Sequence, residues 1–163
     1  MLRLIPRPLH IAALRSAHFV RLRWWRLTRA RVFGCRVVVL DGEDQVLLIR
    51  HSYGSGNWML PGGGLKPKED ALAAARREVF EEVAVRLSDT VAIAVTSGIL
   101  HGASHDVQII AGWTDDVPQA DQREIIEAQF FPVNRLPRGM AHKLAGALPG
   151  YTTAAKAARS RPE

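Results

Sequence analysis

The segment GGGLKPKEDALAAARREVFEEVAV, residues 62–85, is the stretch around which this chain of 163 residues is expected to fold. A turn of three glycines precedes a stretch in which apolar residues recur every three or four positions, the spacing of one helix face. We expect this helix to begin at Lys68 or Glu69 and to end at Val83. Its apolar stripe consists of Ala71, Leu72, Ala75, Val79 and Val83.

Three carboxylates occupy the C-terminal part of this helix, away from the apolar stripe. Glu78, Glu81 and Glu82 stand at positions i, i+3 and i+4, so they share one helix face. Like charges at this spacing repel, and negative charge at a helix C-terminus opposes the helix dipole at a cost of about 0.3–1 kcal/mol per group. The helix gains nothing from them unless a cation lies between. We therefore interpret the three residues as a divalent-metal site for a phosphate-bearing substrate.

Short apolar runs on both sides of the helix predict a β-sheet. Turn residues at 41–44 separate the first two of these runs, and the glycines at 62–64 end the run that precedes the helix. Strands are expected at residues 32–40, 45–51, 58–60, 90–99, 106–113 and 125–132, and a closing helix at 137–148. Strands before and after one well-marked helix are typical of a mixed α/β sandwich, in which the loop at 61–68 and the helix end form one active edge.

Length and composition predict one globular domain, assigned to residues 31–148. The single Cys35 excludes an internal disulfide and lies in an apolar run, so we expect a buried structural thiol. A chain with one thiol suits a reducing compartment, and a cytoplasmic location is the resulting expectation. Residues 149–163 are small and basic and are expected to form a flexible tail.

A basic N-terminal extension, rich in arginine and tryptophan, precedes the domain. Residues 1–40 contain nine arginines and no acidic residue, whereas the remaining residues carry a net charge of −3. Residues 1–30 lack an apolar span near the ~20 residues of a membrane helix, although residues 9–27 suit an amphipathic helix. Three interpretations stay open: packing on the domain or on a second subunit in a homodimer, contact with an anionic membrane surface or nucleic acid, and targeting as a transit peptide.

The order of glycine, acidic and basic residues from Gly63 to Val85 resembles the Nudix box, and the order of strands over residues 31–148 resembles the Nudix fold. Six fixed residues match the box: Gly63, Glu69, Arg77, Glu78, Glu81 and Glu82. A chance match has a probability on the order of 10⁻⁷ per starting position at average residue usage. One position departs, because the family usually has glycine where Ala84 stands. Glycine there suits a left-handed helix cap, so either Ala84 is strained or the helix ends in another way.

The resemblance implies an α/β/α sandwich with a mixed sheet and a loop–helix–loop motif. It also implies that the three helix glutamates bind one or more Mg²⁺ or Mn²⁺ ions, helped by the backbone carbonyl of Gly62. By the same resemblance, Glu69 is a secondary metal ligand or ties the loop to the helix. Arg77 would then orient the glutamates by ion pairing.

The activity that the resemblance implies is hydrolysis of a diphosphate linkage in a nucleoside diphosphate joined to another moiety. Metal ions would neutralise the phosphate charge, and a carboxylate would remove a proton from the attacking water. Glu78 is one candidate base. On a later loop, Glu124 is preferred over Glu127 because it precedes the strand. The substrate stays open, with a nucleoside triphosphate or a nucleotide sugar favoured. A catalytically silent Nudix-fold module that binds a nucleotide is the alternative.

Four side chains outside the box are candidates for substrate contacts. Arg50 ends the second expected strand and could clamp a phosphate, with a solvent-exposed arginine as the alternative. Tyr53, Trp58 and Trp113 could stack on a base, although core packing is the commoner role of such aromatic residues.

Overall fold

The computed structural model describes residues 32–100 and 103–160. The predictions for the extension of residues 1–30 lie outside the described residues. Within them, the elements follow one another as β1 (Val32–Leu40), β2 (Val46–His51), α2 (Ala71–Val83), β3 (Thr90–Leu100), β4 (Ala103–Trp113), β5 (Ile125–Phe131) and α3 (His142–Arg159). None of the described helices is long and apolar enough to cross a membrane.

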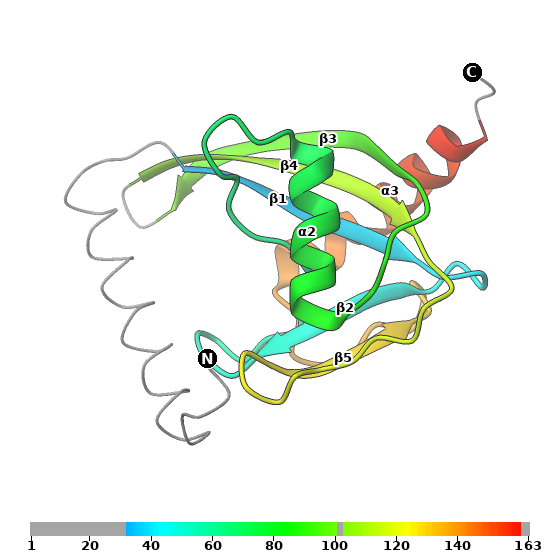
Figure 1. Cartoon of the computed structure of the whole chain (residues 1–163). Helices are drawn as coiled ribbons and strands as arrows, with labels where there is room; N and C mark the ends of the chain where they lie inside the picture. Colours follow the sequence, from blue (N-terminus) through cyan, green and yellow to red (C-terminus); the bar gives the residue numbers. More distant parts are fainter. Residues whose placement is uncertain (1–31, 101–102, 161–163) are drawn as a thin grey trace.

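One five-stranded sheet forms the middle layer, in the order β3-β4-β1-β2-β5. β1 runs parallel to β4, and the other neighbouring strands are antiparallel, so the sheet is mixed. β4 begins earlier than predicted. α2 lies across one face of the sheet and α3 lies behind the other (Figure 1). The predicted α/β class and the sandwich of helices around a mixed sheet are confirmed.

β1 contributes to the hydrophobic core on both faces of the sheet. The odd-numbered side chains from Cys35 to Val39 belong to the core cluster under α2. The even-numbered Val38 and Leu40 belong to the cluster under α3. Successive side chains of a strand point to opposite faces, so a strand covered on both sides is apolar throughout. This double burial explains why the first expected strand has no polar alternation over its second half.

β1 and β2 pair at one end only, where Leu40 lies opposite Val46. Further along, residues 59–65 lie between the two strands. Their backbone makes hydrogen bonds of 2.9–3.0 Å with β1 on one side and with β2 on the other. The strand predicted at 58–60 overlaps the start of this inserted segment and pairs through isolated bridges. The insertion holds the glycine turn against the middle of the sheet.

α2 begins at Ala71, slightly later than predicted, because Asp70 caps it. The Asp70 carboxylate accepts hydrogen bonds of 3.0 Å from two backbone amides of the first turn. The helix ends at Val83, as predicted. Ala84 follows in the left-handed conformation, with φ 57° and ψ 23°. Of the two alternatives for the helix end, the structure shows the strained alanine.

The C-terminal helix differs most from the prediction. In place of a helix at 137–148 and a flexible tail at 149–163, α3 continues to Arg159. Pro149 lies within it, although proline removes a helical hydrogen bond. Helix residues on both sides of this proline are buried, so tertiary packing outweighs the local helix-breaking signal. The prediction of a flexible tail is therefore wrong as far as Arg159.

Replacing Ala84 with glycine is expected to stabilise the protein by up to about 1 kcal/mol. Relief of a left-handed alanine, worth about 1–2 kcal/mol, exceeds the greater freedom of glycine in the unfolded chain. Chemical denaturation of Ala84→Gly and wild type measures the difference. The control is Ala73→Gly, at an exposed position inside the same helix, which should destabilise by about 0.5–1 kcal/mol. A loss of stability in Ala84→Gly as large as in this control would contradict the strained cap.

Candidate active site

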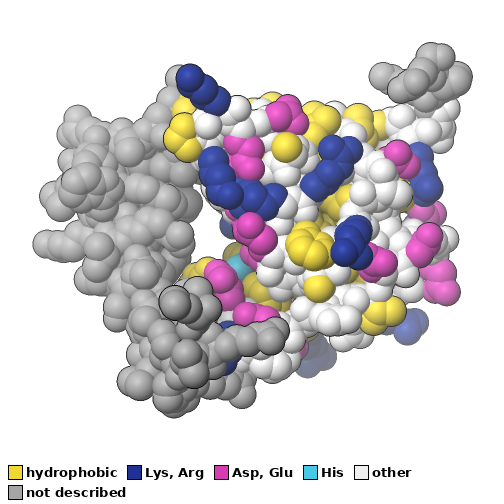
Figure 2. Space-filling model, viewed as in Figure 1, with side chains coloured by type: hydrophobic (Ala, Val, Ile, Leu, Met, Phe, Trp, Pro, Cys, Tyr) yellow, Lys and Arg dark blue, Asp and Glu magenta, His cyan; other side chains and the backbone are white. Residues whose placement is uncertain are grey.

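A pocket of about 380 Å³ lies where the glycine turn, the N-terminal half of β1 and the C-terminal half of α2 meet. The end of β2 with the loop after it, Met59, Val107 of β4 and the residue before β5 complete its lining. The titratable side chains that line it, within the described residues, are Cys35, Arg36, His51, Tyr53, Glu78, Glu82 and Glu124. On the face that carries α2, acidic and basic side chains are interspersed (Figure 2). The pocket differs, because three carboxylates there meet one guanidinium.

The glycine turn approaches β1 and α2 too closely to carry side chains. Gly62 has a φ of +131°, and a Cβ there would collide with the carbonyl oxygen of Cys35. A Cβ on Gly63 would lie 2.5–2.7 Å from the carboxylate atoms of Glu78. Glycine therefore allows the backbone N–H and C=O groups of the turn to lie directly beside the carboxylates of α2.

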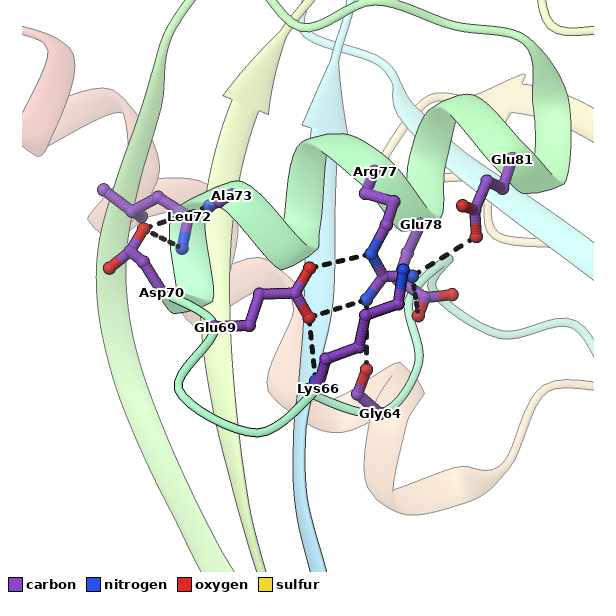
Figure 3. A network of polar contacts seen from close by, with 9 residues as sticks. All are labelled: Gly64, Lys66, Glu69, Asp70, Leu72, Ala73, Arg77, Glu78 and Glu81. Atoms are coloured by element: carbon purple, nitrogen blue, oxygen red, sulfur yellow. Dashed lines mark hydrogen bonds and ion pairs between the residues drawn. The ribbon is translucent and has the colours of Figure 1, made fainter.

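Arg77 joins the loop before α2 to the C-terminal half of the helix (Figure 3). Its guanidinium donates to both carboxylate oxygens of Glu69, at 2.8 Å each. It also donates to Glu78 at 2.7 Å and to Glu81 at 3.2 Å. A further bond of 3.2 Å reaches the carbonyl oxygen of Gly64. The ion pairing that the resemblance implies for Arg77 is present in the structure.

Glu69 serves the loop rather than the pocket. Beside its paired bonds from Arg77, it accepts the backbone N–H of Lys66 at 2.8 Å. Hydrogen bonding from Arg77, and then from Lys66, lowers the pKa of Glu69 to about 2, so the carboxylate stays charged. Glu69 does not line the pocket. Of its two predicted roles, the structure shows the tie between loop and helix.

Glu82 is largely buried, with 10% of its side chain exposed. Its Oε2 accepts the backbone N–H of Gly62 at 2.9 Å, and Nε2 of His51 lies 3.7 Å from Oε1. Burial raises the pKa of Glu82 to about 8, against the effect of the Gly62 hydrogen bond. The nearby carboxylates of Glu78 and Glu124 add to the rise. Burial therefore favours the protonated carboxyl at Glu82, and a bound cation would favour its charged form.

The donor set suits a divalent cation in part. Within residues 32–100 and 103–160, no three His, Cys, Asp or Glu side chains are grouped to hold a metal ion. Glu78 and Glu82 line the pocket together, whereas Glu81 is 57% exposed and lies outside the lining. Mg²⁺ commonly takes one or two carboxylates and completes its shell with water and substrate phosphates. The residues present therefore fit Mg²⁺ through Glu78 and Glu82.

The carbonyl oxygen of Gly62, a predicted metal ligand, is bound by Arg36. Nη1 of Arg36 donates to this oxygen at 2.6 Å and to the carbonyl oxygen of Leu60 at 3.4 Å. The Nudix box does not include Arg36, because this residue lies on β1. The sequence signal that could have identified it is a basic residue inside the apolar run 35–40. Beside it, burial raises the pKa of the Cys35 thiol, so this group is a poor nucleophile.

The two acidic candidates near β5 differ in position. Glu124 lines the pocket, and its Oε1 accepts the hydroxyl of Tyr53 at 2.7 Å. Oδ1 of Asp121 accepts the backbone N–H of Glu124 and of the next residue, at 2.9 Å each. Glu127 lies on β5 outside the pocket lining and pairs with Arg50 at 3.0 Å. The geometry therefore favours Glu124 as the acidic group that faces a ligand.

Three of the four predicted substrate contacts lie outside the pocket lining, and Tyr53 is the exception. Arg50 donates to the carbonyl of Gly56 at 3.0 Å and lies 5.7 Å from the ring centroid of Trp58. Trp58 and Trp113 are buried in the core cluster under α3. The structure thus corrects the stacking interpretation for both tryptophans, because their rings pack inside the core.

Comparisons with known proteins agree with this geometry. A family model described as NUDIX domain matches residues 30–151. Over 46 residues the chain is 50% identical to a diphosphoinositol polyphosphate phosphohydrolase 3-beta from Bos taurus, a match that spans 28% of each protein. Over 64 residues it is 39% identical to an RNA pyrophosphohydrolase from Teredinibacter turnerae, covering 39% of this chain and 37% of that protein. These matches therefore span well under half the length of either relative.

A solved structure shows the same fold over a longer stretch. The MutT NUDIX hydrolase from Burkholderia pseudomallei matches with a TM-score of 0.65 and 22% identity, covering 73% of this chain and 96% of that one. The family model covers the glycine turn, α2 and all five strands. The chain therefore belongs to the NUDIX domain family.

Proposed function

We propose that this protein is a Mg²⁺-dependent pyrophosphohydrolase that cleaves a diphosphate linkage in a nucleoside diphosphate joined to another moiety. The observation that carries the proposal is the meeting of Glu78 and Glu82, from one turn of α2, with Glu124 in a single pocket. Two relatives are named as a phosphohydrolase and a pyrophosphohydrolase, which supports hydrolysis of this kind of linkage.

Glu78 and Glu82 would hold the metal ion. Glu81, which is exposed, would join them by giving up its 3.2 Å contact with Arg77. The carbonyl of Gly62 is a further ligand in this proposal, because its oxygen has a second lone pair beside the bond to Arg36. When bound, Mg²⁺ or Mn²⁺ neutralises phosphate charge and makes a bound water more acidic.

Glu124 is the general base in this proposal. The hydroxyl of Tyr53 occupies Oε1 of its carboxylate, so Oε2 takes the proton of the attacking water. Asp121 keeps the loop that carries Glu124 in place through backbone hydrogen bonds. On α2, Arg77 holds Glu78 beside the glycine turn, where the backbone can approach the phosphates.

A small nucleotide, such as a nucleoside triphosphate or a nucleotide sugar, is the substrate that we favour. The pocket of about 380 Å³ is within the range of small-molecule sites. Tyr53 is the aromatic residue among the predicted contacts that could stack on its base.

A nucleotide-binding module without hydrolytic activity is the second candidate. The observation that favours it is the engagement of several predicted ligands by arginines. Arg77 holds Glu69, Glu78 and Glu81, and Arg36 holds the carbonyl of Gly62. Retention of all the box glutamates favours the enzyme.

A hydrolysis screen in excess Mg²⁺ distinguishes these candidates. It covers nucleoside triphosphates, ADP-ribose, nucleotide sugars, dinucleotides and capped RNA. We expect turnover of at least one substrate, loss of turnover in EDTA, and a decrease of about 100-fold or more in Glu82→Gln. Nucleotide binding without turnover of any substrate would instead identify the non-catalytic module.

The raised pKa of Glu82 predicts a pH-dependent stability of the metal-free protein. The folded state favours the protonated carboxyl, so this stabilisation is complete below the ordinary pKa near 4.5 and is lost as the pH rises through about 8. Glu82→Gln cannot ionise. In EDTA, its melting temperature should therefore exceed that of wild type by more at about pH 9 than at about pH 5. Melting temperatures that differ by the same amount at both pH values would contradict the buried, protonated carboxyl.

Replacing Glu124 with glutamine should lower kcat by about 100-fold or more, the usual contribution of a general base. The glutamine carbonyl can still accept the hydrogen bond of Tyr53, so the loop should keep its structure. Glu127→Gln is the matched control, because it makes the same change on β5 outside the pocket, and its kcat should stay within about threefold of wild type. A decrease of less than about threefold in Glu124→Gln would remove this residue from the mechanism.

A further inference from the structure

Arg36 brings a positive charge into the pocket from the N-terminal half of β1. Its side chain lines the pocket and is partly buried. Nη1 donates to the carbonyl oxygen of Gly62 at 2.6 Å and more weakly to that of Leu60 at 3.4 Å. The charge of Arg36 also acts on Glu82, whose pKa it lowers against the effect of burial. Arg36 thus stands beside the acidic groups that are proposed to act on the diphosphate.

The charges around the pocket leave Arg36 as the side chain to receive a phosphate. Among the described lining residues it is the one arginine or lysine, and it shares the lining with the carboxylates of Glu78, Glu82 and Glu124. A diphosphate is strongly negative, so these carboxylates repel it unless cations intervene. Arg50, the predicted phosphate clamp, lies outside the lining and is already held by an ion pair.

The guanidinium has donors beyond those that hold the glycine turn. In the described part of the chain, both hydrogen bonds of Arg36 use Nη1. An arginine also carries N–H groups on Nε and Nη2, and this edge of the planar group matches two oxygens of a phosphate. One side chain can therefore bind the turn and a phosphate at the same time.

We propose that Arg36 contacts the substrate, binding a phosphate of the scissile diphosphate through Nε and Nη2 while Nη1 holds Gly62. This inference rests on the proposed hydrolase function and deepens it, because it names the protein group that recognises the diphosphate. The shared guanidinium sets the position of the phosphate relative to the glycine turn. Through that turn, it also sets the position relative to Glu82, which accepts the Gly62 amide.

Steady-state kinetics of Arg36→Gln and Arg36→Lys test the inference, with a substrate that the screen identifies. Arg36→Gln should raise KM by about tenfold or more with a smaller change in kcat, because charge-assisted bonds to the phosphate are lost. Arg36→Lys keeps the charge without the planar fork and should recover part of the loss in KM. The matched control is Arg50→Gln, on the neighbouring strand outside the pocket, whose KM should stay within about twofold of wild type.

Binding without turnover separates this inference from the hydrolase proposal. The probe is α,β-methylene-ADP, a diphosphate analogue with a carbon bridge, titrated calorimetrically with Mg²⁺ and with EDTA. Arg36→Gln should weaken its binding by about tenfold while Arg50→Gln does not. If wild type binds the analogue but hydrolyses nothing and Arg36→Gln loses binding, the role of Arg36 in binding a diphosphate stands and the hydrolase proposal fails.

Two results would overturn the role of Arg36 while leaving the hydrolase proposal intact. The first is turnover by wild type with unchanged KM and unchanged analogue binding in Arg36→Gln. The second is a lower melting temperature and lower kcat in both Arg36 variants, with wild-type affinity for the analogue. That pattern would assign Arg36 to holding the turn at Gly62 alone.

Discussion

The guanidinium of Arg77 is the interaction on which the arrangement of this site depends. It relieves the repulsion among Glu69, Glu78 and Glu81 and takes the carbonyl of Gly64 as well. Its planar fork spans both oxygens of Glu69 and still leaves Nη1 for the two glutamates of the helix. The positive charge among these three carboxylates is the guanidinium of Arg77, which belongs to the same segment of the chain.

Glu82 lies outside the Arg77 network, and this separation divides the acidic residues into two kinds. Glu69 accepts hydrogen bonds from Arg77 and Lys66, which lower its pKa, whereas burial raises the pKa of Glu82. A bound metal ion would therefore change the protonation of Glu82 more than that of Glu69, because burial favours the protonated form of Glu82. The N–H of Gly62 keeps that carboxyl in place in the meantime.

The insertion of residues 59–65 between β1 and β2 brings the two halves of the pocket together. It places the glycine turn within reach of Arg36 on one side and of the helix carboxylates on the other. In the C-terminal half of β1, Val38 and Leu40 belong to the core cluster under α3. β1 thus contributes to the core from Cys35 onward and to the pocket with its N-terminal half.

The sequence by itself determined the features whose signals are local: the spacing of the box, the apolar stripe of α2, the burial of β1 and the family. Tertiary structure decided which side chains reach the pocket. Glu124 faces it while Glu127 pairs with Arg50 on the sheet surface. Arg36, rather than Arg50, supplies the positive charge. Likewise, α3 continues through Pro149 because burial against the sheet outweighs the local signal. These outcomes depend on the register of segments far apart in the chain, which periodicity and spacing within one segment do not encode.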